Sequence, residues 1–278
     1  MTPVDKREVA EIRRGFGALE GMLTEKLFWG LVPEGFSKIT DGHGNQWVVR
    51  QDRVGEINGS ICRDNLAGVE ERQYQGRGAL RAIRLRDGET ALVRSYRHGG
   101  LLRGFTREWF FTWPPRPFRE LAITEELRRR GLRTVEVYAA GVHRIAWPFY
   151  RGWLVTRELR EASDLWAALQ NDGVKCGGLR AALKGAADAV RAMHRAGVYH
   201  ADLNLKNILI RAADGGVEGY VIDLDKARLF SGKLPLELAN KNLHRLLRSA
   251  RKLDPERRYL TAGSWDEFLN FYHGGSDA

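Results

Sequence analysis

The chain has 278 residues, of which 43% are hydrophobic, and its formal net charge at pH 7 is +10. It contains no run of about eighteen apolar residues, so the sequence predicts no membrane-spanning helix. The charged N-terminus lacks the apolar core of a signal peptide, and Cys62 and Cys176 lie far apart without metal-type spacing. We therefore expect a cytoplasmic protein with unpaired thiols, built as one large domain or two smaller ones.

The positive charge is unevenly distributed along the chain. Residues 76–119 hold ten Arg or Lys against three acids, and residues 226–260 hold the same numbers, which gives +7 for each segment. This concentration favours an anionic partner: a nucleotide, a phosphorylated substrate, an anionic lipid or a nucleic acid. Nucleic acid is disfavoured, because the sequence shows neither a helix-turn-helix pattern nor a set of zinc ligands. A solvated basic surface is the alternative.

Residues 1–68 have the least readable pattern and are predicted to form an N-terminal extension. They contain one hairpin signal, Asp41-Gly42-His43-Gly44-Asn45, with residues 46–49 as its return strand. Strands are expected next at 69–74, 79–85 and 90–94. Gly76-Arg77-Gly78 joins the first two of these strands, and Asp87-Gly88 is a hairpin turn between the last two.

Arg94 ends the third of these strands. Residues 118–130 predict a helix that stops at Gly131, and Glu120 falls on the partly apolar face of that helix. A carboxylate on an inward face needs a partner. Arg94 is the expected partner. For the cation that binds the phosphates, Arg97 is a nearby competitor of Arg94.

Two more strands are expected at residues 135–137 and 153–156, followed by a connecting hinge at Arg157-Glu158-Leu159. Ser163-Asp164-Leu165 has the residue types that begin a helix. Residues 179–196 repeat apolar side chains at helical spacing, and Gly197 is a natural stop for that helix.

The segment from Tyr199 to Asn207 carries the most informative pattern. Asp202 and Asn207 are five residues apart, and Asp223 follows sixteen residues after Asn207, across two apolar runs that predict a β-hairpin. Phosphoryl transfer from ATP needs one carboxylate to orient the acceptor hydroxyl, and an amide and a second carboxylate to hold Mg²⁺. An isolated His-x-Asp is common by chance, and Asp-Asn-rich loops are often plain turns. Here, however, helix, loop, hairpin and Asp follow in the order of a kinase C-lobe.

The sequence therefore predicts an α+β, bilobal protein-kinase-like fold. We expect a β-rich N-lobe at residues 69–156 and a mainly helical C-lobe at residues 157–278, with residues 1–68 packed on or part of the N-lobe. Asp202 is the expected catalytic base, and Asn207 and Asp223 are the expected Mg²⁺ ligands.

The expected ATP contacts come from three places in the chain. The turn at Gly76, Arg77 and Gly78 would cover the phosphates, although a plain β-turn gives the same pattern. Arg94, paired with Glu120, would bind the α and β phosphates. The backbone of the hinge, at Glu158 and Leu159, would meet the adenine edge.

Peptide substrates are disfavoured, and a small-molecule, sugar or lipid acceptor is favoured. Asp223 is followed by Leu224 and Asp225 rather than Phe-Gly, no Ala-Pro-Glu follows, and a helix starts by about Leu238. Residues 240–252 predict a two-sided helix, with apolar residues on one face. The opposite face carries Lys241, Arg245, Arg248 and Lys252. That basic face is either solvated or meets an anionic membrane or a polyanionic acceptor.

These motifs resemble the lipopolysaccharide core kinases, most closely the 3-deoxy-D-manno-octulosonic acid (Kdo) kinases of Gram-negative bacteria. The resemblance covers residues 72–255. The segments that carry it are Gly76-Arg77-Gly78-Ala79, Val93 to Leu101, Arg116 to Leu121, Gly131-Leu132, His200 to Asn204, Ile222 to Lys226 and Asn242 to Leu246. The combination of Tyr-Arg-x-Gly-Gly, Asp-Leu-Asn and Asp-x-Asp-Lys is far more specific than the kinase loop alone.

The resemblance implies ATP- and Mg²⁺-dependent phosphorylation of a sugar hydroxyl on the lipid A–inner core, at the cytoplasmic face of the inner membrane. It implies the same roles for Asp202, Asn207 and Asp223, and arginine at position 94 is not unusual in that family. A heptose kinase of the lipopolysaccharide core is the runner-up. Another small-molecule kinase, an atypical protein kinase, and a pseudokinase or binding module are the remaining alternatives.

Overall fold

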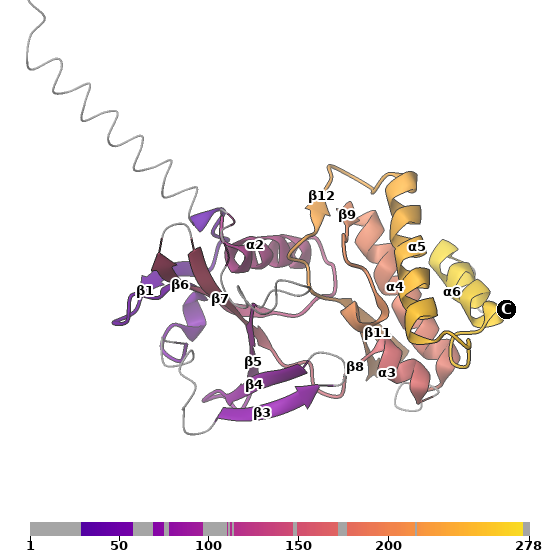
Figure 1. The fold of residues 1–278 in the computed structure, drawn as a ribbon, viewed down its shortest axis with the longest axis horizontal. Helices are drawn as coiled ribbons and strands as arrows, with labels where there is room; N and C mark the ends of the chain where they lie inside the picture. The colour runs from indigo at the N-terminus through magenta and orange to yellow at the C-terminus, as the bar shows by residue number, and fades with distance from the viewer. Residues whose placement is uncertain are drawn as a thin grey trace, which may run out of the picture.

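The computed structural model describes residues 29–57, 69–74, 78–96, 110, 112, 114–146, 149–171, 177–214 and 216–274. The chain forms a β-rich N-lobe with one long helix and a mainly helical C-lobe with a short hairpin (Figure 1). The predicted α+β, two-lobed architecture is confirmed. None of the helices in the described part of the chain has the length and apolar character needed to span a bilayer.

A seven-stranded sheet forms the N-lobe, in the order β1-β2-β6-β7-β5-β4-β3, with each neighbouring pair antiparallel. The strands are β1 (Phe36–Thr40), β2 (Gln46–Arg50), β3 (Val69–Tyr74), β4 (Gly78–Arg84), β5 (Thr90–Ser95), β6 (Val137–Ala146) and β7 (Phe149–Arg157). The hairpin predicted around residues 41–45 is confirmed. Because β2 also pairs with β6, residues 36–50 are part of this sheet.

The strand predicted at residues 135–137 is misplaced, since β6 begins at Val137 and extends to Ala146. Its first half contains Ala139, Ala140 and Gly141, which are weak strand formers. A small residue is needed at position 141 because Trp47 of β2 covers it. A Cβ atom there would lie 2.3 Å from Trp47 Cζ3. This strand is therefore specified by cross-strand packing more than by its own local pattern.

Helix α2 (Arg116–Arg129) packs on β6 and β7 of the sheet. Phe118 and Leu121 are buried in one cluster with residues of β6 and β7, and the helix stops before Gly131, whose φ is +80°. The same inward face carries Glu120, which is only 3% exposed. Packing of the apolar residues thus forces a carboxylate into the interior.

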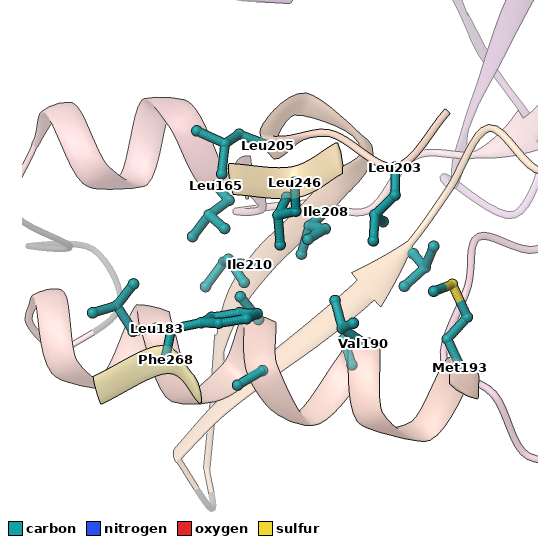
Figure 2. Close-up of a cluster of buried hydrophobic side chains, with 14 of the residues drawn as sticks. Leu165, Leu183, Val190, Met193, Leu203, Leu205, Ile208, Ile210, Leu246 and Phe268 are labelled. Atoms are coloured by element: carbon teal, nitrogen blue, oxygen red, sulfur yellow. The ribbon is translucent and has the colours of Figure 1, made fainter. Parts of the chain in front are cut away.

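The C-lobe contains α3 (Leu165–Gln170), α4 (Leu179–Arg195), α5 (Leu236–Leu253) and α6 (Ala262–His273). Its strands are β8 (Ser163–Asp164), β9 (Val198–Tyr199), β10 (Ile208–Ala213), β11 (Gly216–Val221) and β12 (Arg228–Leu229). The predicted 179–196 helix, the hairpin after Asn207 and the helix start at Asp164 are confirmed, and Asp164 Oδ1 accepts a hydrogen bond from Ala167 N at 2.9 Å. Figure 2 shows Leu183 and Val190 of α4 facing Ile208 and Ile210 of the hairpin.

Two glycines allow α4 and β11 to approach closely. A Cβ atom at Gly219 of β11 would lie 2.1 Å from the Gly185 carbonyl oxygen, and a Cβ atom at Gly185 of α4 would lie 2.8 Å from Val217 Cγ1. The hairpin that leads from Asn207 to Asp223 therefore sits directly against the helix that precedes the His200–Asn207 loop. This contact sets the position of both segments.

Helix α5 is two-sided as predicted. Leu243, Leu246 and Ala250 are buried, and Lys241, Arg248 and Lys252 are exposed. Arg245 is half-buried, and its Nη2 lies 3.5 Å from the Tyr199 hydroxyl. Arg245 is therefore less exposed than the other three cations of the predicted basic face, because β9 packs against α5 on that side.

We predict that Gly219→Ala lowers the free energy of unfolding by about 1–3 kcal/mol, because the new Cβ meets backbone that can move only if the hairpin moves. Urea unfolding measures the loss. Gly263→Ala in α6 is the control, since the nearest atom to a Cβ there is Thr261 Oγ1 at 3.9 Å. The control should be neutral or slightly stabilising. A Gly219→Ala protein as stable as the wild type would contradict the packing described here.

Candidate active site

A cleft of about 380 Å³ lies between the lobes and is lined by both. Its apolar wall includes Leu80, Leu92, Val135, Leu154, Leu209 and Ile222. Its polar side chains include the predicted site residues Arg94, Glu120, Glu158, Asp202, Asn207 and Asp223, and also Asn204 and Lys206. The predicted hinge residue Leu159 lines the cleft as well. A cleft lined by both apolar and charged side chains suits a nucleotide, whose base is apolar and whose phosphates are anionic.

The described residues include only part of the predicted phosphate and adenine contacts. Gly76 and Arg77 lie outside them, and Gly78 begins β4. In the hinge, the Glu158 N–H donates to the Thr90 carbonyl at 2.8 Å. That amide is therefore engaged within the protein. The Glu158 carbonyl and the Leu159 amide are the candidate groups for the adenine edge.

The loop that carries Asp202 is held by its own backbone and by His200. Asn207 Nδ2 donates to the Asp202 carbonyl at 3.0 Å, and the Asp202 N–H donates to His200 Nδ1 at 3.1 Å. His200 Nε2 then donates to the Ile222 carbonyl at 3.0 Å. This pattern requires the neutral ring, and burial lowers the pKa of His200 in agreement with it. The loop is thereby tied to the residue that precedes Asp223.

Asn242 of α5 holds the same loop in place. The sequence alone did not identify this asparagine as a functional residue. It is fully buried, its Oδ1 accepts from the His200 N–H at 3.1 Å, and its Nδ2 donates to the His200 carbonyl at 2.6 Å. Its Oδ1 also lies 3.2 Å from Nε2 of His194, whose pKa burial lowers to about 4. An asparagine on the apolar face of a helix was the available signal, since such a residue needs partners.

Arg94 connects the two lobes. Its Nη2 lies 2.6 Å and 2.5 Å from the two carboxylate oxygens of Glu120, and its Nη1 lies 2.7 Å from Asp223 Oδ1. The predicted Arg94–Glu120 ion pair is confirmed. Tyr96 completes the cluster, because its hydroxyl donates to Glu120 and its ring lies 5.0 Å from the Arg94 guanidinium carbon.

The charges in this cluster shift one another. Burial raises the pKa of Glu120 to about 6, and the neighbouring Arg94 charge opposes that rise. Burial also disfavours the charged form of Arg94, but the carboxylates of Glu120 and Asp223 outweigh it and raise its pKa. Arg94 is therefore charged at all working pH values, whereas Glu120 can take up a proton in mildly acidic solution.

A second ion pair joins the lobes beside the first. Arg116, at the start of α2, bonds to Asp225, which is only 7% exposed. The Arg116 guanidinium carbon lies 5.6 Å from the Tyr96 ring and 5.1 Å from the Phe110 ring. Arg116 and Asp225 both occur in the motifs that resemble those of the lipopolysaccharide core kinases. They are too far apart in the sequence for their contact to be predicted from residue spacing. The pair fixes the segment that carries Asp223, whose φ is +63°.

Asn207 and Asp223 fit a magnesium site. Amide and carboxylate oxygens are the ligands that Mg²⁺ prefers, and this ion usually binds with one or two carboxylates together with substrate phosphates. Asn207 uses its nitrogen for the Asp202 carbonyl, which leaves its oxygen as the ligand atom. The described residues contain no cluster of three or more His, Cys, Asp or Glu suited to a metal. The donor set thus fits an ion held jointly by the protein and a nucleotide.

This chain is similar in sequence and in fold to known proteins. Residues 60–272 match the model of the lipopolysaccharide kinase (Kdo/WaaP) family. A 3-deoxy-D-manno-octulosonic acid kinase of Pasteurella multocida is 32% identical over 189 residues, which cover 64% of this chain and 73% of that protein. The enzyme of the same name from Xanthomonas campestris is 32% identical over 213 residues, covering 75% of this chain and 79% of that protein.

One solved structure, a WaaP in complex with acyl carrier protein, is similar in fold. Its TM-score is 0.52 at 21% sequence identity, and the match covers 85% of this chain and 88% of that chain. At this identity the likeness concerns the fold alone. It confirms the kinase-like class predicted for the two lobes.

We predict a pH-dependent stability that depends on Glu120. A carboxyl pKa raised from 4.5 to about 6 stabilises the fold fully below the unfolded value, and that contribution is lost as pH rises through 6. Between about pH 5 and pH 8, the wild type should therefore lose about 1 kcal/mol of unfolding free energy relative to Glu120→Gln. Chemical unfolding at a series of pH values measures the difference.

Glu126→Gln on the outer face of α2 is the matched control. The Arg129 side chain lowers the pKa of Glu126. The unfolding free energy of Glu126→Gln should therefore not increase relative to that of the wild type as pH rises. Parallel pH profiles for the wild type and Glu120→Gln would contradict the burial of an ionisable Glu120.

Proposed function

The chain belongs to the lipopolysaccharide kinase (Kdo/WaaP) family, and from that membership we propose that it transfers the γ-phosphate of ATP to a hydroxyl of Kdo in the lipopolysaccharide inner core. The resemblance recognised in the motifs is confirmed by the family match. The choice of Kdo as acceptor rests on the names of the similar curated proteins. The observation that carries the chemistry is the meeting of Asp202, Asn207, Asp223 and the Arg94–Glu120 pair in one cleft.

Each residue of the cleft has a role in the proposed transfer. The Asp202 carboxylate orients the acceptor hydroxyl towards the γ-phosphate and takes its proton. Asn207 and Asp223 would hold Mg²⁺, which supplies charge neutralisation at the β and γ phosphates when bound. Arg94 offers guanidinium N–H groups to the α and β phosphates, and Glu120 keeps that side chain pointed into the cleft.

The acceptor side of the cleft favours a small or lipid-linked substrate. Only residues 226–235 separate Asp225 from α5, so the chain has no long activation segment on which a peptide could lie. The Arg116–Asp225 pair holds the metal-binding segment without a phosphorylated residue. We infer that the kinase needs no phosphorylation to become active.

We place the reaction at the cytoplasmic face of the inner membrane, where a lipid A-linked acceptor would be presented. The exposed cations of α5, Lys241, Arg248 and Lys252, support peripheral contact with an anionic surface. Each cation close to such a surface contributes about 1 kcal/mol. Arg245 is less available for this contact, because it is half-buried and its Nη2 lies 3.5 Å from the Tyr199 hydroxyl.

The test is transfer of labelled γ-phosphate from Mg-ATP to purified lipopolysaccharide that carries only Kdo on lipid A. The wild type should label the glycolipid, and Asp202→Asn should lower the rate by about 10²–10⁴-fold, as expected for loss of a general base. Asp214→Asn, the same change in the exposed turn of the hairpin, is the control and should keep the wild-type rate.

Each outcome of this assay has a distinct meaning. Label that appears only when heptose is present would move the acceptor to heptose and keep the mechanism. Consumption of ATP without transfer to either sugar would point to another hydroxyl acceptor. Absence of ATP turnover would contradict the proposal and favour a binding module.

A further inference from the structure

Exposed apolar side chains gather where α2 and the segment after Asp225 meet. A groove of about 260 Å³ lies between them, and its lining includes Leu31, Phe118, Ala122, Ile123 and Leu229. Leu31 is 73% exposed and Leu229 is 37% exposed. In Figure 1, α2, β12 and the first turn of α5 follow one another along one edge of the molecule.

The segment of residues 226–236, called here the docking segment, contributes Leu229 to this groove and carries a second exposed leucine. Leu236, the first residue of α5, is 73% exposed. The other large apolar residues of that helix are buried or half-buried. Single exposed leucines are ordinary on soluble proteins. Several of them beside an apolar groove are unusual, and such patches mark contact with a partner or a membrane.

Cations surround these leucines. Lys226, Arg228 and Lys233 of the docking segment are exposed, and so is Arg119 beside the groove. The acids close by are Glu237, which is exposed, and Glu126, which is bonded to Arg129 and Arg130. Apolar side chains that can enter the interface, ringed by cations, are the composition of surfaces that bind anionic lipid.

We propose that the docking segment and the outer face of α2 bind the surface of an anionic lipid bilayer, with Leu229 and Leu236 entering the interfacial layer. This inference rests on the proposed function for its biological purpose. It differs from the α5 contact because Lys241, Arg248 and Lys252 offer charge without an exposed large apolar side chain. The docking segment begins three residues after Asp223, which lines the cleft, so a bilayer bound by this segment would bring a lipid-linked hydroxyl towards Asp202.

The first test is flotation with vesicles of phosphatidylethanolamine and phosphatidylglycerol, without ATP or acceptor. The double variant Leu229→Ser/Leu236→Ser should bind at least about tenfold more weakly than the wild type. Lys226→Gln/Arg228→Gln/Lys233→Gln should bind about 100-fold more weakly, since each cation near an anionic surface contributes about fivefold. Because all five side chains are exposed, these variants should keep the wild-type fold by circular dichroism.

The matched control is Val54→Ser/Ile145→Ser, which removes two other exposed apolar side chains from the N-lobe. It should bind vesicles within about twofold of the wild type. Equal binding by the leucine variant and this control would overturn the proposal. So would equal wild-type binding to neutral phosphatidylcholine vesicles, or purified acyl carrier protein occupying this surface while the vesicles do not bind.

A second readout separates this inference from the proposed function. With a deacylated, water-soluble Kdo acceptor, the leucine variant should transfer phosphate at the wild-type rate, whereas with bilayer-embedded acceptor its rate should fall in step with vesicle binding. If the leucine variant lost phosphate transfer equally with both acceptors, that result would overturn the docking role. A wild type that binds vesicles through these leucines but transfers phosphate to neither acceptor would leave the docking surface standing and refute the kinase assignment.

Discussion

The arrangement of the cleft depends on a single guanidinium that is shared between two carboxylates of different lobes. Arg94 of β5 contacts Glu120 of α2 and Asp223 of the C-lobe at the same time. A buried carboxylate such as Glu120 is unfavourable unless a charge and hydrogen bonds compensate for its lost solvation. The requirement to satisfy Glu120 therefore holds Arg94 in place, and Arg94 in turn holds Asp223 in the cleft. Removing Arg94 or Glu120 would free the Asp223 carboxylate from this contact with the N-lobe.

The remaining parts of the site are fixed in the same way, by hydrogen bonds and ion pairs between buried or partly buried polar groups. Asn242 bonds both backbone groups of His200, and His200 links the catalytic loop to Ile222. Arg116 and Asp225 form a second bridge between α2 and the C-lobe. In kinases with a regulated activation loop, phosphorylation supplies this ordering. Here internal ion pairs supply it.

Local sequence patterns were sufficient to predict the fold and the polar centre of the site. They could not predict the long-range contacts between side chains. Asp202, Asn207 and Asp223 could be found because a helix, a loop and a hairpin of fixed lengths bring them together. Glu120 could be paired with Arg94 because its place on an apolar helix face demanded a cation. Asn242 and the Arg116–Asp225 pair act through tertiary contacts. The place of Asn242 on an apolar helix face indicates that it needs a partner, but residue spacing does not identify that partner or the Arg116–Asp225 contact. The burial of Arg245 was missed for the same reason, since its cause is the packing of β9 against α5.

The central claim, that one guanidinium organises the nucleotide site from both lobes, is tested most directly by the affinity of Arg94→Lys for Mg-ATP. Lysine keeps the charge, but a single ammonium cannot reach Glu120 and Asp223 with the separate donors that arginine uses. Isothermal calorimetry should show an affinity about tenfold or more below that of the wild type, the value expected for loss of one charge-assisted hydrogen bond. Arg84→Lys on the exposed surface of β4 should leave the affinity unchanged. Wild-type affinity in Arg94→Lys would contradict the account.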